Sequence, residues 1–204
     1  MSPRGALAPL PRSFYERDTI EVAGELLGKL LVRSGPQPSV SRVVEVEAYL
    51  GERDQASHAR RGPTPRAAIM FGPPGHLYVY LVYGIHHCMN VITERDGVAG
   101  AVLLRAAEPA AVGAEAPRAT ASTRPLAGPG KLCAGLGITR AQNGLDLCVA
   151  GTLFVAADPA PPPGVVARVK RSPRIGVAYA GTWASRKLRF YLAGNPHVSG
   201  KPRD

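Results

Sequence analysis

The sequence predicts a mixed α/β fold of the α+β type: one compact domain with a mainly antiparallel sheet, a protruding β-hairpin and several short helices. Three observations support this. The chain has 204 residues and 45% hydrophobic residues, enough for one well-formed core. It contains 23 glycines and 20 prolines, too many for the interiors of a helical bundle. Several short apolar segments are separated by turn residues, as in antiparallel sheets.

The N-terminal segment is expected to be a mobile tail over residues 1–13, with the folded domain spanning residues 14–204. The first helix is predicted after Asp18, because Asp18 and Glu21 have the spacing of a capping box. Apolar residues at Ile20, Ala23 and Leu26 then recur on one helical face. Gly28 is expected to end this helix.

Two strands follow, at residues 30–33 and 42–50. Alternation along the second strand puts Val44, Val46 and Ala48 on one face. Glu45, Glu47 and Tyr49 therefore share the opposite face. Residues 51–76 carry no strand pattern and hold several turn formers, which predicts a long ordered loop with at most a helical turn. Long loops of this kind often carry functional residues.

The segment at 77–83 is rich in tyrosine and valine and predicts a strand that turns at Gly84 and returns at 85–93. Tyr83 then stands beside the bend of a hairpin. Further strands are expected at 98–106, 152–156, 165–170 and 175–179, and a short helix over 128–138. Residues 107–125 are rich in Ala, Pro and Thr, which predicts a linker or irregular segment with weak helical potential.

The composition indicates what kind of partner the protein binds and in which cellular compartment it works. The net charge of +10 attracts polyanions such as nucleic acid, although a solvated basic surface is an equally frequent explanation. The chain has no apolar run of membrane-spanning length and no signal sequence, which predicts a cytoplasmic protein without membrane contact. Cys88, Cys133 and Cys148 form no C-x-x-C pair, so we expect neither a disulfide framework nor a metal site.

Glu45 and Glu47 lie two residues apart on a strand, which places their carboxylates roughly 7 Å apart if the strand is regular. A pair of this kind is most often part of a solvated strand face. Here Tyr49 shares that face, and the following loop supplies His58. A carboxylate that activates water, beside groups that hold a ring, is an arrangement that can hydrolyse a glycosidic bond.

The tyrosines of the predicted hairpin have two possible roles. Tyr78 is expected in the core, and Tyr80 shares its face by strand alternation. Tyr83 faces the other way at the bend, where a bulky ring is poorly buried. An exposed aromatic at such a tip can wedge between bases, and a recessed one can stack on an extruded base.

The segment from Gly128 to Lys131 has some features of a phosphate loop. Pro125 stands where the first glycine of G-x-x-x-x-G-K belongs, and Leu132 replaces the Ser or Thr, so nucleotide hydrolysis is not predicted. A glycine-rich helix start with a lysine can still bind one DNA phosphate, here through Gly130 and Lys131.

Taken together, these residues resemble the alkyladenine (3-methyladenine) DNA glycosylase family, in its bacterial form. The resemblance spans about residues 14–199 in order. It rests on the runs Glu45 to Gly51, Asp54 to His58, Met70-Phe71, Gly75 to Tyr80, Tyr83-Gly84, Cys88 to Val91, Leu103 to Arg105, Glu108-Pro109, Gly128 to Leu132 and Arg189 to Tyr191.

The resemblance implies a monofunctional enzyme of base excision repair that hydrolyses the N-glycosidic bond of a damaged purine and leaves an abasic site. Glu47 would be the general base that deprotonates the attacking water, and Arg105 would help to place that water. The family uses water instead of a lysine nucleophile and needs no metal or other cofactor. Its fold is a compact domain around a curved antiparallel sheet.

The resemblance also implies how damaged double-stranded DNA is bound, by a monomer that associates with the nucleoid through DNA. Tyr49, His58 and Tyr80 would form the pocket for the flipped purine. Asn90 would discriminate against an undamaged guanine. Tyr83 would fill the gap that the flipped base leaves in the duplex.

Two alternatives remain open at this stage. A nucleic-acid-binding module that kept the fold and lost catalysis would be favoured by replacement of Glu47 or Arg105, but both residues are present. A carbohydrate glycosidase using Glu45 and Glu47 would be expected to carry a neutral or acidic surface and sugar-stacking tryptophans. The net charge of +10 and the single tryptophan speak against it.

Overall fold

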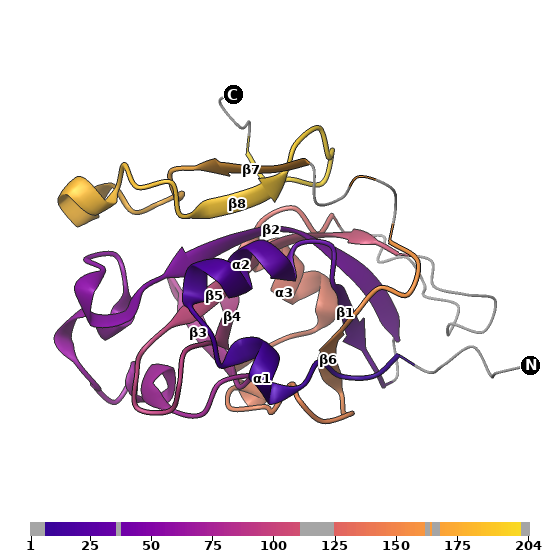
Figure 1. Ribbon diagram of the computed structural model, residues 1–204, viewed down its shortest axis with the longest axis horizontal. Helices are drawn as coiled ribbons and strands as arrows, with labels where there is room; N and C mark the ends of the chain where they lie inside the picture. The colour runs from indigo at the N-terminus through magenta and orange to yellow at the C-terminus, as the bar shows by residue number, and fades with distance from the viewer. Residues whose placement is uncertain (1–6, 36–37, 111–124, 162–163, 165–167, 201–204) are drawn as a thin grey trace, which may run out of the picture.

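An antiparallel sheet forms the centre of the molecule, in a computed structural model that describes residues 7–35, 38–110, 125–161, 164 and 168–200. Strands follow the order β3-β4-β5-β2-β1-β6, and β8 pairs with both β2 and β7. The sheet is curved, with short helices packed around it (Figure 1). The predicted α+β fold is therefore confirmed.

The strands are β1 (Leu30–Arg33), β2 (Ser39–Tyr49), β3 (Leu77–Val82), β4 (His86–Ile92), β5 (Ala101–Pro109), β6 (Leu153–Ala156), β7 (Val169–Ser172) and β8 (Arg189–Leu192). The α-helices are α1 (Arg12–Tyr15), α2 (Thr19–Leu26) and α3 (Pro129–Leu136). Short 3-10 turns are η1 (Gly51–Arg53), η2 (His58–Arg61), η3 (Ala68–Phe71), η4 (Arg140–Gln142) and η6 (Ala178–Trp183). None of the helices within the described ranges is long and apolar enough to cross a membrane.

Strand β2 is the organising strand of the sheet. One of its edges pairs with β5, while the other pairs first with β1 and then, at residues 45–47, with β8. The pairing with β5 is irregular: the register passes from Val43 opposite Ala107 to Glu45 opposite Ala106, then to Val46 opposite Leu104. Val44 on β2 and Arg105 on β5 are the residues skipped by these two shifts. Such bulges re-aim side chains next to functional sites.

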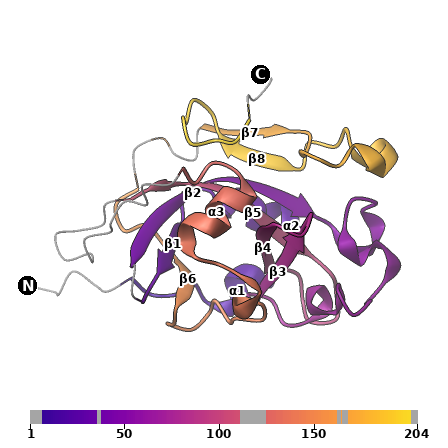
Figure 2. The same ribbon diagram turned by 180° about the vertical axis from the view of Figure 1, so that it is seen from behind.

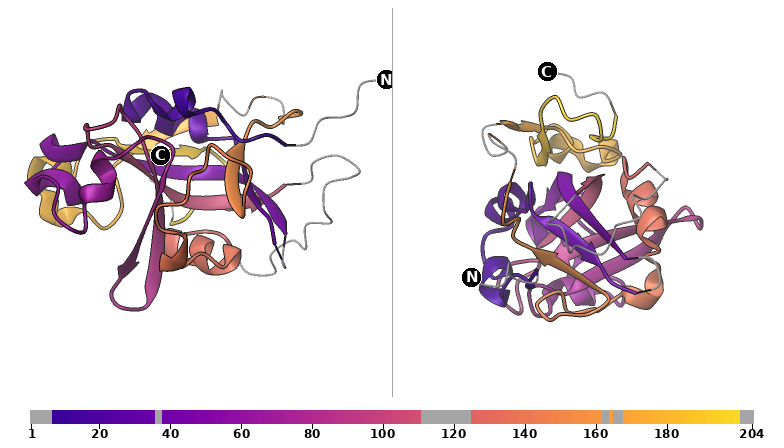
Figure 3. Two further views of the ribbon diagram at one scale, coloured as in Figure 1. Left: turned by 90° about the horizontal axis from the view of Figure 1, so that it is seen from below. Right: turned by 90° about the vertical axis from the view of Figure 1, so that its right-hand side faces the viewer.

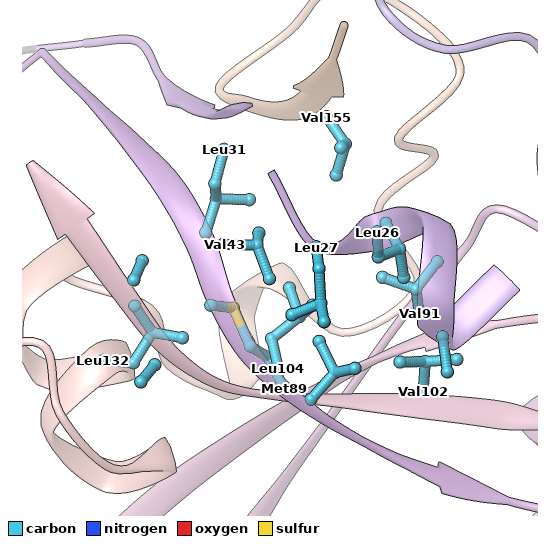
Figure 4. Close-up of a cluster of buried hydrophobic side chains, with 14 of the residues drawn as sticks. Leu26, Leu27, Leu31, Val43, Met89, Val91, Val102, Leu104, Leu132 and Val155 are labelled. Carbon is cyan, nitrogen blue, oxygen red and sulfur yellow. The ribbon is translucent and has the colours of Figure 1, made fainter. Parts of the chain in front are cut away.

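A continuous apolar core ties the sheet to the helices (Figure 4). Helix α2 packs on β2 and β5, and α3, in front in Figure 2, packs on β4 and β5. The Asp18 side chain accepts hydrogen bonds from the backbone N–H groups of Ile20 and Glu21, which confirms the predicted helix start. Val44, Val46 and Ala48 all lie in this core, as their alternation predicts.

The prediction of a mobile tail over residues 1–13 is wrong from Pro9 onward, because Pro9 already forms a β-bridge with Ala156. Residues 1–6 lie outside the described part. Leu10 is buried, and its N–H donates to the carbonyl of Val155 at 2.8 Å. Arg12 begins α1 and donates to the Asp146 carboxylate at 2.6 Å. This segment is held by contacts with residues far along the chain, and a local sequence pattern does not show such contacts.

Other elements also differ from the prediction, and the largest differences lie after residue 100. The segment 175–179 is not a strand, because the chain there runs into η6, and the last strand is instead β8. Strand β5 continues through residues 107–109, where a linker was expected, and residues 111–124 lie outside the described ranges. Of the strand expected at 165–170, β7 contains residues 169 and 170, while 165–167 are not described.

Gly51 offers a test of this packing. Its φ is +64°, and an added Cβ would collide with the backbone carbonyl of Ala99. We expect Gly51→Ala to lower the free energy of unfolding by about 2 kcal/mol or more, since strained backbone alone costs about 1–3 kcal/mol. Gly24→Ala is the matched control: Gly24 lies inside α2 with open space around it, and this change should stabilise the protein by roughly 0.5–1 kcal/mol. Urea unfolding measures both, and equal effects would contradict the described packing.

Candidate active site

A cavity of about 490 Å³ opens between the β3–β4 hairpin, the loop that follows β2, and the segment before η6. Its lining includes six of the residues selected from the sequence, which come from distant parts of the chain: Tyr49, His58, Tyr80, Tyr83, Asn90 and Arg105. Glu47 lies next to this lining, hydrogen-bonded to Tyr49 and ion-paired with Arg105. The structure thus brings the predicted catalytic and pocket residues together.

Glu47 is fully buried, so the alternative of a solvated strand face is wrong. Its carboxylate accepts hydrogen bonds from the Tyr49 hydroxyl at 2.9 Å and from the backbone N–H of Ile175 at 2.8 Å. Arg105 Nη1 lies 3.2 Å from its Oε1 atom. Burial raises the pKa of Glu47 above its usual value, although Arg105 and the two hydrogen bonds oppose the shift and Glu45 adds to it.

Glu45 is equally buried and holds Arg105 in place. Its Oε1 accepts from the Nε of Arg105 and from the Nε of Arg189, both at 2.7 Å. Ser199 donates to the same carboxylate from its backbone N–H at 2.6 Å and from its hydroxyl at 2.9 Å. Because Arg105 is the skipped residue of the β5 bulge, its guanidinium can bond Glu45 through Nε and face Glu47 through Nη1.

The sequence pattern does not predict this network, because it indicates no partner for Glu45. Arg189 and Ser199 lie more than 140 residues after Glu45 and reach it only because β8 pairs beside residues 45–47 of β2. The sole local signal was the recurrence of two glutamates on a strand flanked by apolar residues. A pattern of that kind does not identify the cations that neutralise them.

His58 and two tyrosines form the aromatic wall of the cavity. The Nδ1 atom of His58 lies 3.0 Å from the hydroxyl of Tyr78, and its ring meets Tyr80 edge-on with 4.6 Å between centroids. Tyr78 is buried, as predicted, yet it belongs to this wall. Burial, followed by the charges of Arg66 and Arg60, lowers the pKa of His58 to about 4, so its imidazole is neutral at pH 7.

Asn90 lies on β4 opposite Tyr78, with its side chain buried. Its Nδ2 donates to the Tyr78 carbonyl at 3.2 Å, which fixes the orientation of the amide at the cavity wall.

A buried ion pair between Arg174 and Asp54 lies behind Tyr49 at the cavity wall. Arg174 donates twice to the Asp54 carboxylate, at 2.5 and 2.8 Å, and its guanidinium lies 4.6 Å from the centroid of the Tyr49 ring.

Tyr83 stands at the tip of the β3–β4 hairpin, which projects from the body of the molecule (Figure 3). Its side chain is 92% exposed, and its φ is +51°. The left-handed conformation is unfavourable for a bulky residue, and strain of this kind is typical of functional positions. The hairpin tip also carries Ile85, which is 71% exposed.

The proposed phosphate site lies at the start of α3. Gly130 sits against His86 of β4, close enough that an added Cβ would lie 3.2 Å from that ring. Lys131 is exposed, and Pro129 lines the cavity. The start of α3 is therefore next to the hairpin and the cavity.

Within the described residues, no cluster of His, Cys, Asp or Glu side chains could hold a metal ion.

Residues 13–196 match the family described as methylpurine-DNA glycosylase. The chain belongs to this family. It is also similar to several curated proteins that carry the name "Putative 3-methyladenine DNA glycosylase". One from Methanocella arvoryzae is 50% identical over 93% of this chain and 95% of its own. Others come from Anaeromyxobacter dehalogenans, 54% identical over 95% and 86%, and Legionella pneumophila, 46% identical over 93% and 97%.

The Glu45 network of this methylpurine-DNA glycosylase family member predicts a large effect on stability. In Glu45→Gln, two buried arginines lose a shared carboxylate charge, and we expect the free energy of unfolding to fall by about 3–5 kcal/mol. Glu108→Gln is the control. Glu108 pairs with Arg42 at 2.8 Å but is partly exposed, and Arg42 keeps its contact with Asp158, so a loss of about 1 kcal/mol or less is expected. Similar losses in urea unfolding would refute the distinction.

Proposed function

We propose that this protein is a monofunctional DNA glycosylase that removes alkylated or deaminated purines from double-stranded DNA. The observation that carries the proposal is a buried carboxylate, Glu47, paired with Arg105 beside an aromatic cavity from which a hairpin with an exposed tyrosine projects. Membership of the methylpurine-DNA glycosylase family and the names of the relatives support it. The net charge of +10 suits a polyanionic substrate.

In the proposed reaction the flipped purine enters the cavity and stacks on its aromatic residues. Glu47 takes a proton from a water molecule, and the water oxygen forms a bond to C1′ of the deoxyribose as the bond from C1′ to the purine nitrogen breaks. The bonding electron pair leaves with the purine. The negative charge of Glu47 also stabilises the developing sugar cation, and Arg105 places the water.

Residues other than Glu47 and Arg105 recognise the base. Tyr49, His58 and Tyr80 surround the purine, and Asn90 discriminates against the exocyclic amine of guanine. Tyr83 occupies the duplex where the damaged base was stacked, which compensates part of the cost of flipping. Backbone phosphates are bound near the start of α3 by Gly130 and Lys131. The alternative of a non-catalytic binding module has no comparable support, because the Glu47–Arg105 pair is intact.

Glu47→Gln tests the catalytic assignment. The amide is nearly isosteric with the carboxylate but cannot accept the proton of water, so single-turnover excision of hypoxanthine should fall about 100-fold or more. Affinity for the same duplex should be retained. Excision is measured by alkaline cleavage of the abasic site, and affinity by titration of a labelled duplex. Near wild-type excision by this variant would refute the mechanism.

The pH profile gives an independent test of the same group. Only the deprotonated form of Glu47 accepts a proton, and burial raises the pKa of this carboxyl. Excision by the wild-type protein should therefore decline as pH falls, with a midpoint above the ordinary value of 4.5. The residual activity of Glu47→Gln should lack this decline.

Tyr83→Asn separates DNA wedging from folding. Asparagine tolerates a positive φ better than tyrosine, so this variant should be at least as stable as the wild type. It should nevertheless excise a fully paired lesion about tenfold or more slowly, since unstacking costs a few kcal/mol, and it should nearly match the wild type on a lesion in a bulge. Tyr80→Leu should impair both substrates. Equal losses for Tyr83→Asn on the two substrates would eliminate the wedge.

A further inference from the structure

One pocket residue has no role in the mechanism described above. Arg66 lies between η2 and η3 and lines the cavity. Its guanidinium lies 5.1 Å from the centroid of the Tyr80 ring. The same charge lowers the pKa of His58 and opposes the rise in the pKa of Tyr78, so it acts on all three rings of the aromatic wall. Arg66 was not among the residues selected from the sequence.

The charge of Arg66 differs from that of Arg105, the other arginine in the cavity lining, and from that of Arg174, which contacts the lining residue Tyr49. Arg105 is neutralised by the two buried glutamates, and Arg174 by its double contact with Asp54. In the described parts of the chain, no carboxylate lies within ion-pair distance of Arg66, while the adjacent His58 is neutral at pH 7. Within the described residues, Arg66 is therefore the arginine of the cavity lining whose positive charge has no carboxylate partner.

We propose that Arg66 sets the lesion preference of this site toward neutral damaged purines, such as deaminated adenine, and against cationic alkylpurines. This inference rests on the proposed function. A purine that stacks on Tyr80 shares that ring with the guanidinium. Arg66 is exposed at the edge of the cavity. When a purine stacks on Tyr80, the guanidinium repels a cationic purine and attracts the carbonyl oxygen of a neutral one.

The same charge favours neutral purines in the bond-breaking step. A neutral purine departs with the bonding electron pair and becomes negative, so a nearby guanidinium stabilises the departing group. An N7-alkylated purine starts with a positive charge and departs as a neutral molecule, which gains nothing from Arg66. Binding and departure therefore shift the preference in the same direction. Attraction of a cation by the tyrosine rings is opposed by the guanidinium already present at Tyr80.

The test compares two lesions, hypoxanthine and 7-methylguanine, each opposite cytosine in one duplex sequence. Single-turnover excision of both is measured for the wild type and for Arg66→Met, which removes the charge and keeps much of the side-chain length. We expect the ratio of hypoxanthine to 7-methylguanine excision to fall about tenfold in Arg66→Met. Using a ratio cancels any effect on DNA binding that both substrates share.

Two further variants serve as controls. Arg66→Lys keeps the positive charge and should hold the ratio within about twofold of the wild type. Arg61→Met removes an exposed charge from the same loop, outside the cavity lining, and should leave the ratio unchanged. A uniform loss for both lesions in Arg66→Met would show that Arg66 does not distinguish them by charge and would overturn the inference. A wild-type protein that excises neither lesion would instead overturn the proposed function, and this inference with it.

Discussion

The candidate active site depends on four charged side chains buried in the middle of the sheet. Glu45 and Glu47 come from one strand, and Arg105 and Arg189 from the strands on its two sides. No single one of them is tolerable there, because a buried charge without its partner costs several kcal/mol. The cluster is stable only as a balanced set in which the donors and acceptors satisfy one another. The charge of the proposed general base, Glu47, is thus built into the fold.

The backbone is adapted to this cluster in two ways. The pairing of β2 with β5 has bulges at Val44 and Arg105, and the Arg105 side chain there contacts both Glu45 and Glu47. The C-terminal segment then closes over the cluster, with Ser199 donating twice to Glu45 and Ile175 donating to Glu47. Chain segments that are distant in sequence therefore cover the carboxylates and exclude water, which is why burial raises the pKa of Glu47.

Order and strain are distributed unevenly around the cavity. The carboxylates of Glu45 and Glu47 are buried and held by several defined partners, whereas the hairpin tip carries an exposed tyrosine in an unfavourable backbone conformation. Side chains held in this way suit the proposed task of positioning a water molecule. An exposed, strained tip suits the proposed role of Tyr83 as a side chain that enters a DNA duplex. The two requirements are met by separate elements.

The sequence by itself determined the α+β class, most strand positions and six of the residues that line the cavity, because periodicity, turn residues and family motifs are local properties. Tertiary structure alone decided that Glu45 and Glu47 are buried, since a strand face that looks polar becomes interior only when β8 and the C-terminal segment cover it. Residues 175–179 form no strand in the folded protein, and the backbone N–H of Ile175 instead donates to Glu47. Leu10 and Arg12 are held in place by hydrogen bonds to residues far along the chain. Charge neutralisation between residues more than 100 positions apart leaves no periodic signal. Only the folded chain therefore shows which arginines are paired, and that Arg66 has no carboxylate partner among the residues that the structure describes.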